Sequence, residues 1–259
     1  MIVRIREFIK SSLEAYWYRL FAAGFVFRRG LPRDMREKEF EEIYNACKAY
    51  TMTSPERMYA LYKSVTYVIR AGIPGDFVEC GVWRGGSAML IAFTLLRMNS
   101  TERKIYLYDT FTGMTEPGAK DVRVFGSSPA KNVWRKMQKE HHNEWAFASL
   151  QEVKKNLAAT AYPVHQLVFV QGKVEETIPR VVPSSIALLR LDTDWYESTI
   201  HELRYLFPLL AQHGVVLIDD YGCFQGAKEA VDTYIQENNI PLLLQRVDYT
   251  GRIGVKIKK

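Results

Sequence analysis

The sequence lacks an apolar run at its N-terminal end that is long enough to cross a membrane. Charged side chains interrupt the aromatic-rich residues 1–30, and the longest uncharged apolar stretch there, residues 20–27, is far short of the roughly 20 residues that a spanning helix needs. A transmembrane helix is therefore excluded here. An amphipathic helix remains, which we expect to pack on the protein or on a second subunit, with peripheral membrane contact as the alternative.

Cysteine is also scarce, and repeats, low-complexity tracts and Gly/Ser linkers are absent. The three cysteines, Cys47, Cys80 and Cys223, lack the spacing of a metal site. We expect reduced, buried thiols in a cytoplasmic protein. The absence of linkers argues against separate modules.

Neither sign of charge dominates the chain. The 35 basic and 29 acidic residues give a formal net charge of +6, which is too moderate to indicate a nucleic-acid partner, and we expect none. With 259 residues, of which 47% are hydrophobic, the chain can bury a full core. We expect one domain of catalytic size with an extension.

The pattern of apolar residues predicts alternating strands and helices from residue 75 onward. Strands are expected at residues 76–80, 104–109, 166–172, 186–192 and 215–220, and helices at 87–98, 150–160, 197–214 and 227–239. Residues 242–247 and 252–258 suit a terminal antiparallel hairpin. This alternation predicts an α/β fold with a doubly wound, mostly parallel sheet covered on both faces.

Two further helices are expected before this fold, at residues 39–50 and 55–71. The second has Thr53 or Ser54 as its N-cap, followed by Pro55 and Glu56, and Ser149 is the expected N-cap of the later helix at 150–160. We therefore divide the chain into a helical N-terminal extension, residues 1–72, and a catalytic domain, residues 73–259. Residues 110–148 are too long for an ordinary connection and are expected to form a partly helical lid.

Ligands bind beyond the carboxyl ends of the strands in an open parallel sheet. The end of the first expected strand reads Glu79-Cys80-Gly81, followed by a glycine turn into a helix, and the second strand ends at Asp109. The turn lacks the G-x-G-x-x-G spacing of a dinucleotide site, and Glu79 would repel a pyrophosphate. An adenosine with an amino-acid tail fits better, and S-adenosylmethionine is such a ligand. A merely structural turn and a capping Asp109 are the alternatives.

Four aspartates follow the next two expected strands, Asp192 and Asp194 after one, Asp219 and Asp220 after the other. If the strands are neighbours, the carboxylates repel one another unless a cation lies between them. Hard oxygen ligands favour Mg²⁺ over Ca²⁺ or Mn²⁺. In the alternative, the aspartates cap the following helices and pair with Arg190 or Lys228.

Four stretches follow one another in the sequence: PGDFVECGVWRGGSAML, YLYDTFTGM, LRLDTDWYESTIHEL and VVLIDDYGCFQGAKEAVDTY. In this order, they resemble the macrocin O-methyltransferase family (TylF, MycF, NovP), over about residues 52–234. The resemblance implies a Rossmann-like class I methyltransferase domain that uses S-adenosylmethionine and Mg²⁺ to methylate a sugar hydroxyl. It also implies that helical N-terminal additions help to form homo-oligomers and to cover the site.

The resemblance assigns roles residue by residue. Asp192, Asp219 and Asp220 match the metal ligands, and Asp194 matches the proposed general base. The expected cofactor contacts are Met52, Thr53, Glu79, Cys80, Gly81, Val82, Trp83, Arg84, Asp109, Thr110, Phe111, Gly113, Met114, Ser149 and Glu176, with Glu79, Gly81 and Arg84 at the methionine end, Asp109 at the ribose, and Ser149 and Glu176 near the adenine.

The acceptor cannot be transferred from the family. Thr193 stands where the family pattern has a small glycine, and the region after Asp109, which should form part of the acceptor pocket, looks longer than in the antibiotic enzymes. An antibiotic sugar, a surface polysaccharide and a glycolipid all stay open, with a phenol less favoured. Trp195 and Tyr196 either line this pocket or pack in the core, and His141 and His142 are expected to be solvated loop residues rather than acceptor contacts.

Two other function classes remain. A D-x-D motif after an apolar strand also suits a metal-dependent glycosyltransferase, which would leave Glu79 and Asp109 unexplained. The aromatic N-terminal helix suits a non-catalytic binding protein on a methyltransferase scaffold, although the intact set of carboxylates argues for activity.

Overall fold

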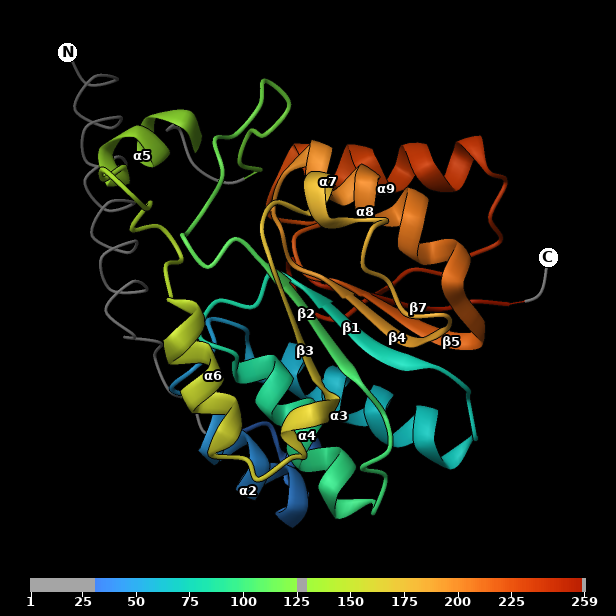
Figure 1. Cartoon of the computed structure of the whole chain (residues 1–259). Helices are drawn as coiled ribbons and strands as arrows, with labels where there is room; N and C mark the ends of the chain where they lie inside the picture. The colour runs from blue at the N-terminus through green and yellow to red at the C-terminus, as the bar shows by residue number, and fades with distance from the viewer. Residues whose placement is uncertain (1–30, 125–129, 258–259) are drawn as a thin grey trace.

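The computed structural model describes residues 31–124 and 130–257, and its centre is a seven-stranded sheet (Figure 1). The expected helix within residues 1–30 lies outside the described residues. The strands lie in the order β3-β2-β1-β4-β5-β7-β6. Their bounds are β1 (Asp76–Cys80), β2 (Ile105–Asp109), β3 (Leu167–Gln171), β4 (Ile186–Leu191), β5 (Leu210–Ile218), β6 (Gln245–Arg246) and β7 (Arg252–Val255).

The directions of the strands agree with the predicted sheet. Strands β1 to β5 pair in parallel, whereas β7 runs antiparallel to both β5 and β6. The chain winds from β1 to β2 and β3 on one side and resumes with β4 and β5 on the other. The order therefore reverses between β1 and β4, where an open sheet of this kind binds its ligands.

Helices cover both faces of the sheet (Figure 1). One face carries α2 (Lys38–Cys47), α3 (Pro55–Arg70), α4 (Gly86–Arg97) and α6 (Leu150–Ala158), and the other carries α7 (Val174–Thr177), α8 (Tyr196–Leu206) and α9 (Gln225–Glu237). Short 3₁₀ turns lie at Arg33–Met35, Val164–Gln166 and Phe207–Leu209. Among the described residues, no helix combines the length and the apolar character needed to span a bilayer.

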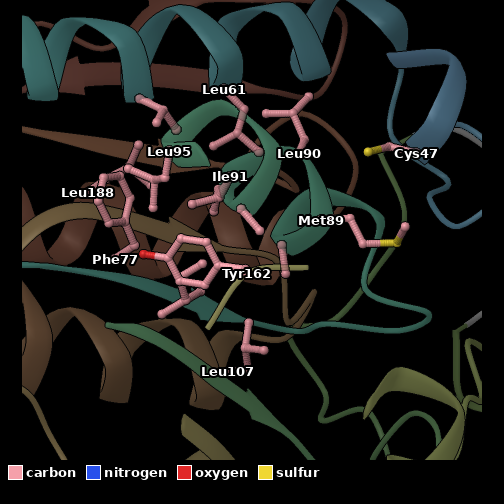
Figure 2. Packing of buried hydrophobic residues seen from close by; sticks show 14 of the residues in the cluster. Cys47, Leu61, Phe77, Met89, Leu90, Ile91, Leu95, Leu107, Tyr162 and Leu188 are labelled. Carbon is pink, nitrogen blue, oxygen red and sulfur yellow. The ribbon is translucent and has the colours of Figure 1, made fainter. Parts of the chain in front are cut away.

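The core beneath the expected site is filled by apolar side chains of α4. Leu90 and Ile91 lie between Leu61 of α3 and the strand residues Phe77 and Leu188, and all five are at most 1% exposed (Figure 2). Burying one such side chain stabilises the fold by about 1.5–3 kcal/mol. This packing gives the carboxyl ends of β1 and β4 a fixed support.

Two serines cap helices as the sequence predicts. The Ser54 hydroxyl accepts a hydrogen bond from the Arg57 amide at 3.2 Å, at the start of α3. The Ser149 hydroxyl accepts one from the Glu152 amide, also at 3.2 Å, at the start of α6. Ser54 rather than Thr53 is therefore the N-cap of α3. The residues next to Ser54 in the sequence were sufficient to predict where this helix begins.

The helix expected over residues 197–214 is shorter than predicted. It ends at Leu206, a 3₁₀ turn that contains Pro208 follows, and β5 already begins at Leu210. Proline cannot donate the hydrogen bond that a continuing helix needs. The Lys256 ammonium group also donates to the Leu210 carbonyl at 2.6 Å, which ties this corner to the end of the chain. For these reasons, the residues from Leu210 onward belong to a strand and not to the helix.

The C-terminal hairpin forms, but its strands are shorter than expected. The carboxylate of Asp248 accepts the amides of Thr250 and Gly251 at 2.9 and 2.7 Å and so closes the turn between them. Within the described part of residues 110–148 there is one helix, α5 (Ala130–Met137). The action of this region as a lid stays a prediction.

Candidate active site

The ends of β4 and β5 bring three aspartates together. The two strands pair with Leu191 opposite Ile218, so the residues that follow them leave the sheet side by side. Asp192, Asp219 and Asp220 each offer a carboxylate oxygen, and these oxygens lie within 4.8 Å of one another. The predicted neighbour relation of the two strands is confirmed. The arrangement can hold one shared cation.

A buried arginine joins this cluster to β1. The Arg190 guanidinium lies 2.8 Å from the carboxylates of Asp192 and Asp219 and 2.7 Å from that of Glu79. Arg190 is only 2% exposed. The alternative in which aspartates pair with Arg190 is therefore right for two of them, whereas Lys228 pairs on its own helix. Arg190 offsets part of the repulsion and fixes both strand ends.

A second arginine comes from the N-terminal helices. Arg57, in the first turn of α3, contacts the Asp219 carboxylate and lies 3.0 Å from the Asp248 carboxylate. The Ser54 hydroxyl also donates to Asp248, at 2.7 Å. The region before the sheet and the C-terminal hairpin thus both contribute to the site.

Negative charge still exceeds positive charge around the three aspartates. Burial raises the pKa of Asp192 and of Asp220, and neighbouring carboxylates raise it further, although Arg57 opposes the rise in both and Arg190 opposes it in Asp192. The Oδ2 atom of Asp220 is buried and has no hydrogen-bond partner among the described residues. A bound cation would offset the repulsion and give this oxygen a partner, so the donor set fits Mg²⁺.

Asp194 lies beside the cluster in a left-handed backbone conformation, with φ of 65°. The Trp195 amide donates to the Thr193 carbonyl at 2.7 Å, so Asp194 is the middle residue of a tight three-residue turn. Burial, and then the charge of Asp192, raises the pKa of Asp194 to about 8, while a hydrogen bond with Asp220 opposes the rise. The ionised form of a carboxylate with such a pKa is a stronger proton acceptor than an ordinary aspartate near neutral pH.

The glycine turn after β1 lies directly against these residues. Gly81 has φ of 83°, and a Cβ atom there would overlap the backbone of Asp192, so only glycine allows this close approach. The amides of Val82 and Trp83 donate to Asp109 at 2.7 and 3.0 Å. Burial raises the pKa of Asp109, and these hydrogen bonds oppose the rise. Asp109 therefore orders the turn, whatever else it binds.

Two cavities meet at Asp192. The first runs over the ends of β1 to β4, and the expected residues that line it are Gly81, Asp109, Thr110, Gly113 and Met114. The second lies between the turn and the β4–β5 cluster, and the expected residues that line it are Met52, Thr53, Val82, Trp83, Asp192, Asp194, Asp219 and Asp220. The metal set, the base and most of the cofactor set are thus brought to one place.

Six expected cofactor contacts line neither cavity. Cys80 and Phe111 are buried in the core, Glu79 is buried against Arg190, Arg84 pairs with Glu152 at 2.6 Å, Ser149 caps α6, and Glu176 is exposed on α7. Their assigned contacts with the cofactor stay predictions, because each of these side chains already has a place in the protein or points away from the cavities.

Several lining residues were not anticipated. Arg57, Trp145 and Tyr249 line the second cavity, and residues 173–175 line the first. The only signal for the latter was the neighbouring strand end at Gly172. Nothing in the local sequence marks Arg57 or Tyr249, because both reach the site through the packing of distant segments.

The open aromatic and histidine assignments are clarified by packing. Trp195 is 3% exposed, stacks edge-on against Trp145 and Phe224, and lines neither cavity, nor does Tyr196. The packing alternative therefore describes Trp195. The His141 side chain is largely exposed. All three cysteines are free, and Cys223 lines the second cavity instead of being fully buried as expected.

A sheet of this order, with cavities at its carboxyl edge and a glycine turn after β1, defines a Rossmann-like methyltransferase. The model of the macrocin O-methyltransferase (TylF) family matches residues 32–254, and the chain belongs to this family. Its membership makes the protein an O-methyltransferase and supports the expected use of S-adenosylmethionine.

Two curated relatives are similar over most of their length. A Streptomyces olivaceus enzyme named 8-demethyl-8-(2,3-dimethoxy-alpha-L-rhamnosyl)-tetracenomycin-C 4'-O-methyltransferase is 34% identical over 78% of this chain and 74% of its own. The demethyldecarbamoylnovobiocin O-methyltransferase of Streptomyces niveus is 32% identical over 82% of this chain and 79% of its own. The solved structure of the O-methyltransferase NovP has a TM-score of 0.71 and 30% identity, and covers 96% of this chain and all of its own.

Proposed function

We propose that the protein transfers the methyl group of S-adenosylmethionine to a sugar hydroxyl of a glycoside, a glycan or a glycosylated natural product, with Mg²⁺ held by Asp192, Asp219 and Asp220. The observation that carries the proposal is the surplus of carboxylates directly beside the glycine turn. The name of the tetracenomycin relative contains a rhamnosyl group, which supports a sugar-bearing acceptor.

The cofactor is proposed to lie across the glycine turn. The adenosine would occupy the first cavity near Asp109 and Gly172, and the methionine end would lie near Thr53 and Trp83 in the second. The left-handed Gly81 allows this close approach to the backbone, and the acidic surroundings suit the cationic sulfonium. Binding here would direct the methyl group towards Asp194.

The acceptor is proposed to enter the second cavity, where Trp145 and Tyr249 offer aromatic surface near the aspartates. When bound, Mg²⁺ supplies positive charge that stabilises the oxyanion formed from the sugar hydroxyl. Asp194 would accept the proton of this hydroxyl, and the hydroxyl oxygen would take the methyl group in line as the sulfur–methyl bond breaks and S-adenosylhomocysteine leaves. The protein contributes chiefly alignment, since the cofactor brings its own leaving group.

Methyl transfer to a panel of glycosides and glycans, with and without EDTA, tests the proposal. We expect transfer to at least one sugar acceptor and loss of activity in EDTA that added Mg²⁺ restores. Activity that EDTA leaves untouched would remove the metal from the mechanism, and transfer to phenols alone would remove the sugar.

Calorimetry separates the proposal from the glycosyltransferase alternative. S-adenosylhomocysteine should bind, whereas a nucleoside diphosphate sugar should not, because the aspartates of the second cavity repel a pyrophosphate and the two arginines that line it, Arg57 and Arg190, are both paired with carboxylates. The opposite result would favour the glycosyltransferase.

We further propose a cytoplasmic homo-oligomer in which the first 30 residues contribute contacts between subunits. Sedimentation of the full chain and of a variant that lacks these residues would test this. An equal number of subunits in the particles of the two proteins would contradict it.

A further inference from the structure

Residues 114–124 cross the N-termini of α8 and α9 and bind groups that these helices leave unpaired. The N-caps of the two helices are Trp195 and Phe224, and neither makes a side-chain capping hydrogen bond. The first amides of a helix need partners from outside it. For α9, the Val122 carbonyl accepts the Gln225 amide at 2.8 Å.

For α8, the partner is a buried carboxylate from this distant segment. The Oδ1 atom of Asp121 accepts the Tyr196 amide at 2.8 Å, and its Oδ2 atom accepts the Gly118 amide at 2.7 Å. Asp121 is only 4% exposed. A residue 75 positions away in the sequence thus caps the helix that begins two residues after Asp194, the proposed base.

Gly226, in the first turn of α9, makes room for this contact. A Cβ atom at Gly226 would overlap the Oδ1 atom of Asp121 and would lie 3.2 Å from the Tyr196 amide nitrogen. Alanine is otherwise the better helix former. The glycine is therefore explained by the space that the Asp121 carboxylate needs.

The capped amide is two residues after Asp194, whose left-handed conformation is unfavourable for a residue with a side chain. Such a conformation persists only where the surrounding structure holds it. The turn itself is closed by the hydrogen bond from the Trp195 amide to the Thr193 carbonyl. After the turn, the Trp195 indole donates to the Thr115 carbonyl at 3.1 Å, and Asp121 accepts the Tyr196 amide. Both anchors come from residues 114–124.

We propose that Asp121 is a positioning residue for methyl transfer. By binding the Tyr196 amide, it holds the start of α8 and so keeps the Asp194 carboxylate in the orientation needed to accept the proton, and Gly226 leaves the space for it. This role rests on the proposed function of Asp194. It concerns a side chain that lines neither cavity.

The test uses the full-length variants Asp121→Ala, Asp121→Asn, Gly226→Ala and the double variant Asp121→Ala/Gly226→Ala. We expect kcat to fall about tenfold in each alanine single variant, with the KM for S-adenosylmethionine within about twofold of wild type. The Asp121→Asn variant should lose less kcat than Asp121→Ala, because the asparagine carbonyl can still accept the Tyr196 amide, although its NH2 group cannot accept the Gly118 amide. The double variant should be no slower than Asp121→Ala, because both changes remove the same contact.

Asp76→Ala is the matched control. Its carboxylate also accepts a backbone amide, that of Lys104 at 3.0 Å, but at the opposite edge of the sheet. All rates are expressed per folded protein, measured by circular dichroism. Unchanged kcat in Asp121→Ala, an equal loss in Asp76→Ala, or losses that multiply in the double variant would overturn the role. If Asp121→Ala does not fold, Gly226→Ala decides in the same way, because its Cβ atom displaces the same carboxylate.

Hydrogen exchange at the Tyr196 amide gives a readout that does not depend on activity. Exchange should be faster in Asp121→Ala and Gly226→Ala, intermediate in Asp121→Asn and close to wild type in Asp76→Ala. Unchanged exchange in Asp121→Ala and Gly226→Ala would show that Asp121 does not hold the Tyr196 amide. If the wild-type protein transfers no methyl group to any acceptor, the proposed function fails, and the exchange rates still decide whether Asp121 holds α8.

Discussion

The two halves of the sheet's carboxyl edge use acidic residues in opposite ways. At the ends of β1 and β2, Glu79 is buried against Arg190 and Asp109 accepts amides of the glycine turn. At the ends of β4 and β5, four aspartates face a cavity that two arginines, Arg57 and Arg190, also line. A carboxylate at a strand end can thus order the protein itself, or it can leave charge for a ligand. The partners decide which.

The largest effect should follow from Asp194→Asn, on the β4–β5 side. Asparagine keeps the size of the side chain but cannot accept the proton, so kcat should fall about 10³-fold, or about 4 kcal/mol in the activation barrier. The affinity for S-adenosylhomocysteine, measured by calorimetry, should change little. Methyl transfer at the full rate would remove Asp194 as the base.

The second prediction concerns Glu79, on the other side. Burial raises the pKa of Glu79 from its ordinary 4.5 to about 7, although Arg190 opposes this. The folded protein then retains a proton that the unfolded chain loses above pH 4.5, so this group makes the protein less stable as the pH rises from 4.5 to 7. The amide introduced by Glu79→Gln does not titrate. The free energy of unfolding of wild type minus that of Glu79→Gln should fall by about 3 kcal/mol across this window.

Urea unfolding of both proteins at several pH values measures this difference without the cofactor or metal. The other buried carboxylates titrate in both proteins and cancel to first order. A difference that stays constant, or that grows with pH, would show that Glu79 is ionised throughout, as a simple ion pair with Arg190 would require.

The third prediction is a stabilisation by Mg²⁺ that depends on the β4–β5 cluster. At a concentration about 100-fold above Kd, a ligand that binds only the folded protein adds about 2.7 kcal/mol to the free energy of unfolding. We expect Mg²⁺ to raise the free energy of unfolding of the wild type by about this amount over its value in EDTA, and to raise that of Asp220→Asn little or not at all. Asp232→Asn, which removes a carboxylate paired with Lys228 on the surface of α9, is the control. An equal gain in all three proteins would place the ion elsewhere.

The smallest effect is expected for Ser149→Ala. Its hydroxyl caps α6 and lines neither cavity, so its loss should lower the free energy of unfolding by about 1 kcal/mol and leave the affinity for S-adenosylhomocysteine unchanged. Thermal unfolding and calorimetry measure the two quantities. A tenfold loss of affinity would instead support the adenine contact that the family resemblance implies.

Patterns within short segments predicted much of the fold. The apolar periods located β1 to β5 and most of the helices, and Ser54 and Ser149 marked helix starts because a capping hydroxyl acts on an amide three residues away. The end of α8 was missed because the apolar residues after Leu206 suit either a helix or a strand. Pro208, together with the contact of Lys256 with this corner, decides between them.

The residues of the candidate site also divide into those that local sequence predicts and those that it does not. Asp192, Asp219 and Asp220 could be predicted as a cluster, since parallel strands end at one edge of the sheet. Arg57 and Asp248 could not, because they are far apart in the chain and meet only through the packing of α3 and the C-terminal hairpin. The same holds for Asp121, whose partner is an amide at the start of α8.

By itself, the sequence determined the order of strands and helices, the glycine turn and which strand ends carry carboxylates, because these depend on neighbouring residues and on the alternation of apolar positions. Only the tertiary structure decided which carboxylates remain available to a ligand. That depends on which donors reach them, and Arg57, Arg190 and the backbone amides around Asp109 and Asp121 are brought there by contacts between segments far apart in the chain.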